Sequence, residues 1–267
     1  MVTVLVLVLY ERPFTIQNRL VLNLCINNII FCVYVLPVYI YDLYVNINSS
    51  WGWFCTFQGF AYVFLPCNIM LAYLHITLHR YFAIVFVSKI NGPSYGSYKK
   101  TCMIIIASTL LVVAILFPGL LHKWGSFARS PVFGNCTVLP STFNIFGQTL
   151  AVVLPLCTMI YCYSHILYIV RKQRTRVQAM LPVNSETKSQ DVRLTVASVL
   201  IVLIFFISFM PTLLGDQIPF LRGLVPFQGL SGVLAFTHAL TDPVIYVFFD
   251  KKLKDDLKKM FRKCRCN

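Results

Sequence analysis

The stretch TCMIIIASTLLVVAILFPGLL, residues 101–121, contains no charged side chain. A helix that crosses the hydrocarbon core of a bilayer needs about 20 mostly apolar residues, and this stretch has that length. Further runs of the same kind cover residues 20–44, 57–79, 143–170, 194–214 and 224–249. The sequence therefore predicts an all-α membrane protein with six clear spans.

The composition argues against a water-soluble protein. Of the 267 residues, 58% are hydrophobic and 12% are charged, whereas about 25% of a typical soluble domain is charged. A soluble all-α protein with a large core is the alternative, but so few charges could not cover its surface.

The opening run VTVLVLVLY, residues 2–10, is apolar but too short to cross a bilayer. A signal peptide would have a basic segment before such a run and a small-residue cleavage site after it, and neither is present. We interpret the run as the inner half of a seventh span whose outer half lies outside this chain. We therefore expect one seven-helix domain over residues 1–249 and a tail over residues 250–267.

Lysine and arginine are distributed unequally among the loops, and this predicts the orientation. If the loop 11–19 is cytoplasmic, the outer side holds only Lys123, Arg129 and Arg222, and the C-terminus lies inside. The net charge of +14 then mainly reflects the excess of lysine and arginine on the cytoplasmic side of the membrane. Nucleic-acid binding is not expected, because no soluble domain offers a basic face. Anionic lipid of the inner leaflet is the expected partner of the basic tail.

The tail DKKLKDDLKKMFRKCRCN combines basic residues with apolar residues at helical spacing. This pattern predicts a basic amphipathic helix along the inner leaflet, with a solvated charged tail as the alternative. Cys264 and Cys266 at its end are candidate palmitoylation sites.

The predicted outer side contains two cysteines and two glycosylation sequons. Cys55 and Cys136 lie where the compartment permits disulfides, whereas most of the other cysteines lie inside spans and suit packing. Asn48 and Asn135 begin Asn-x-Ser/Thr sequons and are candidate glycosylation sites.

We find no signature of an enzyme. The sequence lacks the common metalloprotease, nucleotide-binding and serine-hydrolase motifs, and it has no paired Cys-x-x-Cys motif. Of nine acidic residues, only Asp242 lies clearly inside a span. We therefore expect no catalysis, no metal site and no cofactor.

Proline and aromatic residues recur near the ends of the predicted spans. They occur in VVLPLCTMIYCY (152–163), FFISFMP (205–211) and TDPVIY (241–246), and HRY (79–81) ends another span. Together with Cys55 and Cys136, these motifs resemble the rhodopsin-like, class A G protein-coupled receptors over about residues 2–264. The spacing also agrees, because Cys55 precedes Arg80 by 25 residues, Pro155 precedes Tyr163 by eight, and Phe205 precedes Pro211 by six.

The resemblance implies a plasma-membrane receptor that binds an extracellular ligand and activates a heterotrimeric G protein when the sixth span swings outward. It implies a Cys55–Cys136 disulfide, a resting pair between Arg80 and Asp191, and prolines that kink their helices. The implied coupling and switch residues are His79, Arg80, Tyr81, Asp191, Tyr163, Asp242, Pro243, Tyr246, Pro155, Phe205 and Pro211. For the tyrosines Tyr163 and Tyr246, a place in the interfacial aromatic belt is the alternative.

Several positions depart from the family pattern. His79 stands where an acid is usual, and Phe209 replaces the usual tryptophan of the sixth span. Asn28 and Ile69 occupy two positions of the family's sodium site, which argues against sodium modulation. Pro66 in the middle of the third span is expected to bend it.

By the resemblance, the ligand-facing residues are Tyr62, Val63, Pro66, Phe209, Leu213, Asp216 and Phe236. The Tyr62 position has no aspartate, which disfavours amine ligands, and the last two spans have no lysine for retinal. We expect a small, weakly charged or lipid-like ligand. The branch resemblance is faint, either to melatonin and invertebrate orphan receptors or to nucleotide and lipid receptors. A non-signalling receptor remnant and a small secondary transporter are the rival interpretations, although no internal repeat supports a transporter.

Overall fold

The structure is a computed structural model, and only part of the chain is described. Described residues are 16–44, 52–85, 98–129, 136–139, 141–177, 185–218, 220, 224–249, 254, 255, 258, 259 and 262. Within these ranges, the side chains of 42–44, 98, 171–177, 185–192, 213, 216, 217, 225, 226, 228 and 229 lie outside the description. The N-terminal run 2–10, the sequons at Asn48 and Asn135, and the tail cysteines Cys264 and Cys266 also lie outside it.

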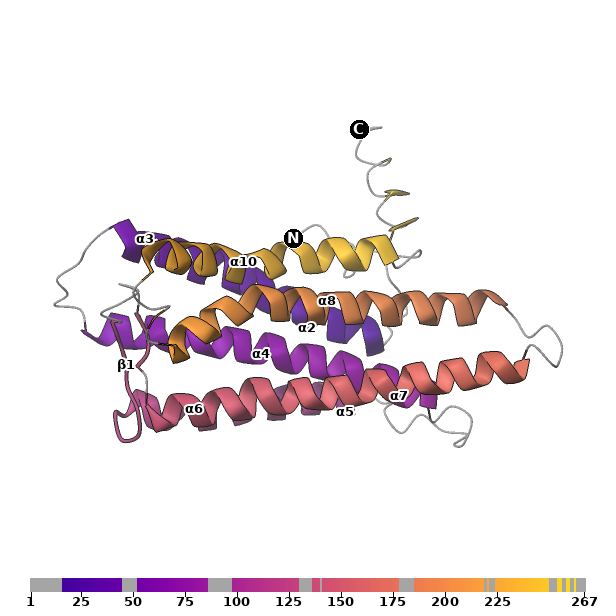
Figure 1. Cartoon of the computed structure of the whole chain (residues 1–267), viewed down its shortest axis with the longest axis horizontal. Helices are drawn as coiled ribbons and strands as arrows, with labels where there is room; N and C mark the ends of the chain where they lie inside the picture. Colours follow the sequence, from indigo (N-terminus) through magenta and orange to yellow (C-terminus); the bar gives the residue numbers. More distant parts are fainter. Residues whose placement is uncertain are drawn as a thin grey trace.

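Within the described residues, six helical spans form a bundle with their axes roughly parallel (Figure 1). The first span comprises α2 (Ile16–Ile30), η1 (Phe31–Val35) and α3 (Leu36–Tyr44), and the second is α4 (Gly52–Val85). The others are α5 (Tyr98–Leu120), the run α6 (Thr142–Gln148), η2 (Thr149–Val153) and α7 (Leu154–Val177), then α8 (Ser185–Gln217) and α10 (Val225–Phe249). All six are long and apolar enough to cross a membrane, so the six predicted spans are confirmed.

Helix α4 is the centre of the bundle. It contacts α2, α5, α7 and α8 as well as the two short strands, and its apolar residues are the most buried of the six spans. A helix that is hydrophobic all round is expected in such a place. Pro66 lies inside α4 without ending it.

The prolines are accommodated in two ways. Pro37 and Pro155 each follow a π-helical segment, η1 or η2, which supplies an extra residue in the turn before the proline ring. A wider turn relieves the clash between that ring and the carbonyl one turn earlier. Pro211 and Pro243 lie inside the continuous helices α8 and α10. Figure 1 shows α8 changing direction towards its C-terminal end, where Pro211 lies.

A small hairpin modifies the all-α prediction. Strand β1 (Phe127–Arg129) pairs antiparallel with β2 (Cys136–Val138), with Phe127 opposite Val138. Cys136 is bonded to Cys55 near the start of α4, with Cα atoms 5.2 Å apart, so the predicted disulfide is confirmed. We call this the disulfide end of the bundle. The opposite end, where α4 carries Arg80, is the Arg80 end.

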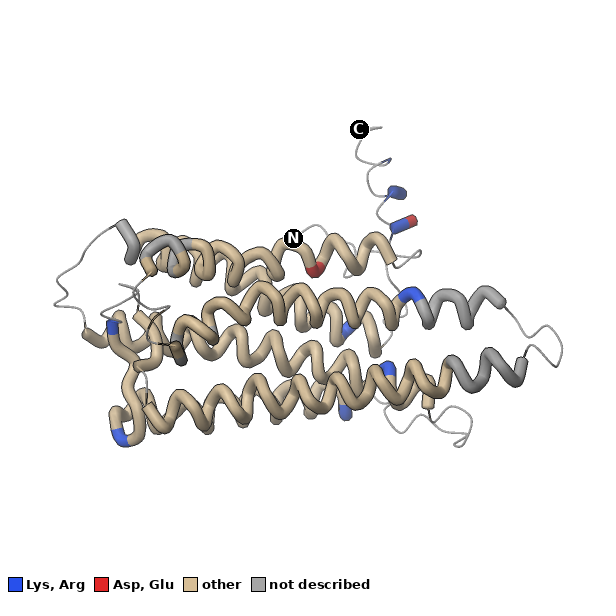
Figure 2. Tube along the Cα trace, in the orientation of Figure 1, with Lys and Arg blue, Asp and Glu red and all other residues tan. Residues whose placement is uncertain are grey.

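The described charges gather at the two ends of the bundle, and the long middle is almost uncharged (Figure 2). Asp242 is an exception, because it lies inside the bundle. In the tail, the described residues are exposed, and Lys254 Nζ lies 5.9 Å from the centre of the Phe248 ring. The apolar face predicted for the tail lies outside the described residues, so the amphipathic helix stays a prediction.

The hairpin covers a small core of its own. Phe127, Val138 and Phe143 pack there with Val112 and Leu116 of α5. The chain reaches β1 through Gly125, whose φ of +82° is favourable only for glycine. A Cβ at this position would also overlap the Phe143 ring.

We therefore expect Gly125→Ala to lower the free energy of unfolding by about 1–3 kcal/mol, because left-handed backbone and a clash combine. Thermal unfolding of the purified protein measures the effect. Gly52→Ala at the same end is the matched control, because its Cβ would meet nothing within 4 Å. Equal melting temperatures for the two variants would contradict this account of the turn.

Candidate functional site

One face of α4 joins the two ends of the bundle. Side chains that are three or four residues apart share a face of a helix. The residues at this spacing are Tyr62, Pro66, Met70, Tyr73, Thr77 and Arg80. We call this set the α4 stripe. Its first three members line a cavity, and its last three make polar contacts with other helices.

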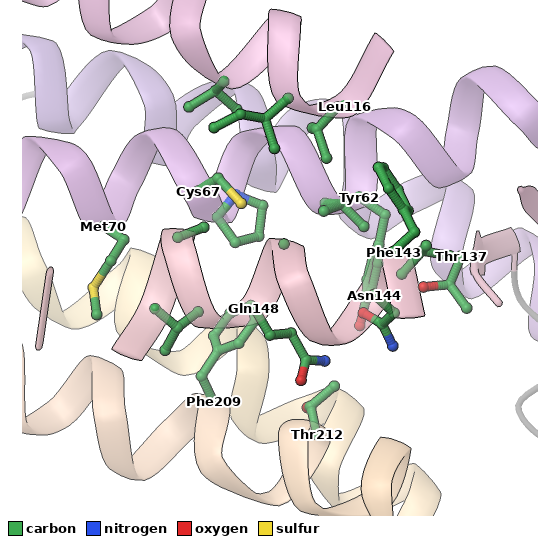
Figure 3. Close-up of a pocket in the computed structure, with 18 of the residues that line it drawn as sticks. Tyr62, Cys67, Met70, Leu116, Thr137, Phe143, Asn144, Gln148, Phe209 and Thr212 are labelled. Carbon is green, nitrogen blue, oxygen red and sulfur yellow. The ribbon is translucent and has the colours of Figure 1, made fainter. Parts of the chain in front are cut away.

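The cavity lies nearer the disulfide end, between α4, α5, the α6–α7 run, α8 and strand β2. Its empty volume is about 890 Å³, which includes space open to the outside. Figure 3 shows side chains from these elements around it, with Tyr62 on α4, Gln148 on α6 and Phe209 on α8.

The structure brings four of the predicted ligand-facing residues to this cavity, namely Tyr62, Val63, Pro66 and Phe209. The side chains of Leu213 and Asp216 lie outside the description. Phe236 is not among the described residues that line the cavity. The sequence did not single out the lining residues of α5 or of α6, among them Asn144 and Gln148.

Aromatic rings fill the bundle on the side of α3 and α10. Tyr39 stacks on Tyr62 with ring centres 6.2 Å apart, and it also contacts Phe236. Phe236 stacks on Phe31 at 4.8 Å. These rings occupy the space beside the α4 stripe, which explains why Phe236 packs in the core and does not line the cavity.

A second series of rings leads from the cavity towards Asp242. Phe209 lines the cavity and stacks on Phe205 with centres 5.0 Å apart. Phe205 meets the Tyr73 ring edge-on at 5.2 Å. Phe205 itself lines the cavity, so a ring of the cavity wall packs directly against Tyr73.

Tyr73, Asn28 and Asp242 form a buried polar triad that joins three helices. The Tyr73 hydroxyl donates to Asp242 Oδ2 at 2.5 Å, and Asn28 Nδ2 donates to the same oxygen at 2.8 Å. Asp242 is 1% exposed, and a buried carboxylate needs such donors because desolvation is costly. Asp242 thus ties α10 to α4 and α2.

Arg80 lies deeper than the sequence suggested. The third span was predicted to end at residue 79, but α4 continues to Val85 because the apolar residues after Arg80 do not break the helix. Arg80 is 4% exposed, and its Nη2 donates to Gln17 Oε1 of α2. The backbone of Asp191 lies on α8, but its side chain is outside the description. The Arg80–Asp191 pair therefore stays a prediction.

The remaining switch candidates lie beside the α4 stripe near the Arg80 end. Tyr163 Oη lies 2.9 Å from Thr77 Oγ1, and Tyr163 and Tyr246 are both buried in the main core. Burial at these positions contradicts the alternative that they belong to an interfacial belt. Tyr81 Oη lies 3.0 Å from Nδ1 of His165, while His79 is partly buried beside Arg80.

Residues 1–246 match the family described as 7 transmembrane receptor (rhodopsin family). The chain belongs to this family. The receptor is therefore a multi-pass protein of the plasma membrane that binds a ligand and signals through G proteins.

The relatives include chemokine receptors. The mouse probable C-C chemokine receptor type 3 is 25% identical and aligns with 98% of this chain and 74% of its own. The C-C chemokine receptor type 1 of Macaca fascicularis is 28% identical, with coverages of 98% and 75%. These relatives lend no support to the faint melatonin-like resemblance. The crystal structure of squid rhodopsin matches the fold with a TM-score of 0.81 at 20% identity, over 98% of this chain and 80% of that one.

Sequence reasoning missed Tyr73 and Gln17, although one signal was available. Tyr73 and Thr77 lie seven and three residues before Arg80 and so share its face of the helix. A buried acid such as Asp242 also calls for a donor on a neighbouring helix. No comparable signal identified Gln17, because α2 offers several polar side chains.

Proposed function

We propose that a ligand in the cavity changes the packing of α8 and α10 around the α4 stripe, so that the Arg80 end binds a heterotrimeric G protein and promotes nucleotide exchange. The observation that carries this proposal is the α4 stripe. The same helix face lines the cavity, holds Asp242 through Tyr73 and ends at Arg80.

The proposed orientation places the disulfide end outside the cell and the Arg80 end, with the C-terminus, in the cytoplasm. The Cys55–Cys136 bond supports this orientation, because disulfides persist in oxidising compartments. Basic residues near the Arg80 end, such as Lys99, Lys100 and Arg193, also favour a cytoplasmic position.

Movement of α8 is the proposed conformational step. A ligand shifts an equilibrium only if it binds the two states with different affinity. Phe209 of α8 lines the cavity and stacks on Phe205, so a ligand in the cavity contacts the helix that is proposed to move. Pro211 removes one backbone hydrogen bond of α8 and lowers the cost of bending there.

Removing the Arg80 side chain tests the coupling. Arg80→Ala should reduce nucleotide exchange by about fivefold or more, the low end of typical coupling between sites, because the Arg80 end loses the charge that contacts the G protein. The assay measures GTPγS binding to purified G proteins by the receptor in lipid nanodiscs. Lys123→Ala, an exposed basic residue at the disulfide end, is the matched control.

The same assay separates the rival functions. If neither the receptor nor an activated variant promotes exchange on any G protein class, a non-signalling remnant replaces the proposal. Substrate flux in proteoliposomes would instead favour a transporter. Unchanged exchange in a well-folded Arg80→Ala receptor would remove Arg80 from the coupling surface.

A further inference from the structure

The cavity is lined by uncharged side chains. Among its described lining residues there is no acid, lysine, arginine or histidine. Apolar side chains dominate the lining, including Pro66, Met70, Val112 and Leu116. An isolated charge inside such a cavity would lose its hydration without gaining a counterion.

Polar groups are concentrated in one part of this cavity. Asn144 of α6 and Thr137 of β2 lie close together beside Phe143, and the Gln148 amide lies one turn further along (Figure 3). Asn144 is 5% exposed. Its backbone N–H bonds to Ser141 Oγ at the start of α6, while its side-chain amide makes no hydrogen bond to another described group.

The Asn144 amide is available to a ligand of matching chemistry, because Asn144 lines the cavity. Its NH2 group donates two hydrogen bonds and its oxygen accepts them. A hydroxyl, ester or amide of a ligand satisfies these groups without adding a net charge. A carboxylate or an ammonium group would remain uncompensated.

We propose that the cavity binds an uncharged amphiphile, with a hydroxyl, ester or amide head at Asn144 and Thr137 and an apolar body against Pro66, Leu116 and Phe209. The body then contacts Phe209, whose ring stacks on Phe205. This inference specifies the ligand class for the proposed receptor function and rests on it for its role in signalling.

Cys67 provides a reporter that needs no known ligand. Its thiol is a free cysteine on the cavity wall. Cys157 of α7 is a free, exposed cysteine that does not line the cavity, and it serves as the internal control. A small, membrane-permeant maleimide is applied until each thiol is measurably alkylated, and mass spectrometry of peptides follows every site separately.

The decisive experiment compares ligands that have the same apolar chain but different polar head groups. The receptor in phosphatidylcholine nanodiscs is incubated with oleyl alcohol, oleamide, oleate or oleylamine, and a second series carries an octyl chain in case the longer body does not fit. The alcohol and the amide should protect Cys67 from alkylation at about tenfold lower concentration than oleate and oleylamine, the effect of one buried hydrogen bond on affinity. Alkylation of Cys157 should not change.

A change at Asn144 tests the position of the head. Asn144→Leu should abolish the preference for uncharged heads, and Asn144→Asp should transfer the preference to the amine, because the new carboxylate supplies a counterion. Thermal unfolding shows whether both variants fold, and Asn144→Asp keeps the size of the side chain if the leucine variant fails.

Two results would overturn the inference. One is that oleate or oleylamine protects Cys67 of the unmodified receptor as well as the neutral compounds do. The other is that every compound slows Cys157 and Cys67 equally, which would indicate a bilayer effect. The labelling needs no G protein, so the two proposals fail separately. Protection without any nucleotide exchange would count against signalling, whereas exchange without protection would count against this ligand class.

Discussion

Tyr73→Phe should raise basal nucleotide exchange by the receptor about fivefold or more, the low end of coupling energies of 1–3 kcal/mol. The substitution keeps the ring against Phe205 and removes only the hydroxyl that donates to Asp242 Oδ2. Asp242 Oδ1 has no hydrogen-bond partner among the described groups, so Asn28 would be the one remaining donor that the structure describes. The link between α4 and α10 is thereby weakened, and states in which these helices separate become more populated.

The same substitution should lower the stability of the receptor by about 0.5–1.5 kcal/mol, the net contribution of one hydrogen bond, because Asn28 still donates to Asp242 Oδ2. Tyr41→Phe is the matched control, because Tyr41 is 53% exposed on α3. A double-mutant cycle with Asp242→Asn measures the pair directly, since residues that share a network do not contribute additively. A coupling energy near zero, together with unchanged basal exchange, would show that the triad does not restrain the receptor.

Loss of the disulfide should have the second large effect. Replacing Cys55 and Cys136 together by serine should lower the free energy of unfolding by about 2–5 kcal/mol, the usual effect of removing a native disulfide. The bond fixes β2 on the end of α4, and β2 supplies Thr137 and Val138 to the cavity wall. We therefore expect the variant to lose protection of Cys67 by uncharged amphiphiles as well as stability.

Thermal unfolding of the purified receptor measures the loss, and Cys157→Ser is the control because that thiol is free and exposed. Reductant added to the unmodified receptor should reproduce the effect of the double substitution. If reduced and oxidised receptors melt at the same temperature, the bond does not stabilise the fold.

The sequence by itself determined the spans and the motifs that they carry. Each span must satisfy its backbone hydrogen bonds internally within the bilayer, so an apolar run such as 101–121 becomes a helix regardless of its neighbours. Within such helices the spacing along the chain is fixed, so the separations of Cys55 from Arg80, of Pro155 from Tyr163 and of Phe205 from Pro211 carried the family resemblance together with the other motifs. The short hairpin β1–β2 was missed, because its three-residue strands leave little pattern to recognise.

Tertiary structure decided which helix faces meet. Hydropathy does not determine which face of a membrane helix points into the bundle, because lipid and the bundle interior are both apolar. Only the packing of α4 against α10 and α2 places Tyr73 on Asp242 and Arg80 on Gln17. The cavity has the same origin, since its wall combines residues of six separate elements. Asn144 and Gln148 thus became candidates only because the bundle places α6 beside α4 and α8.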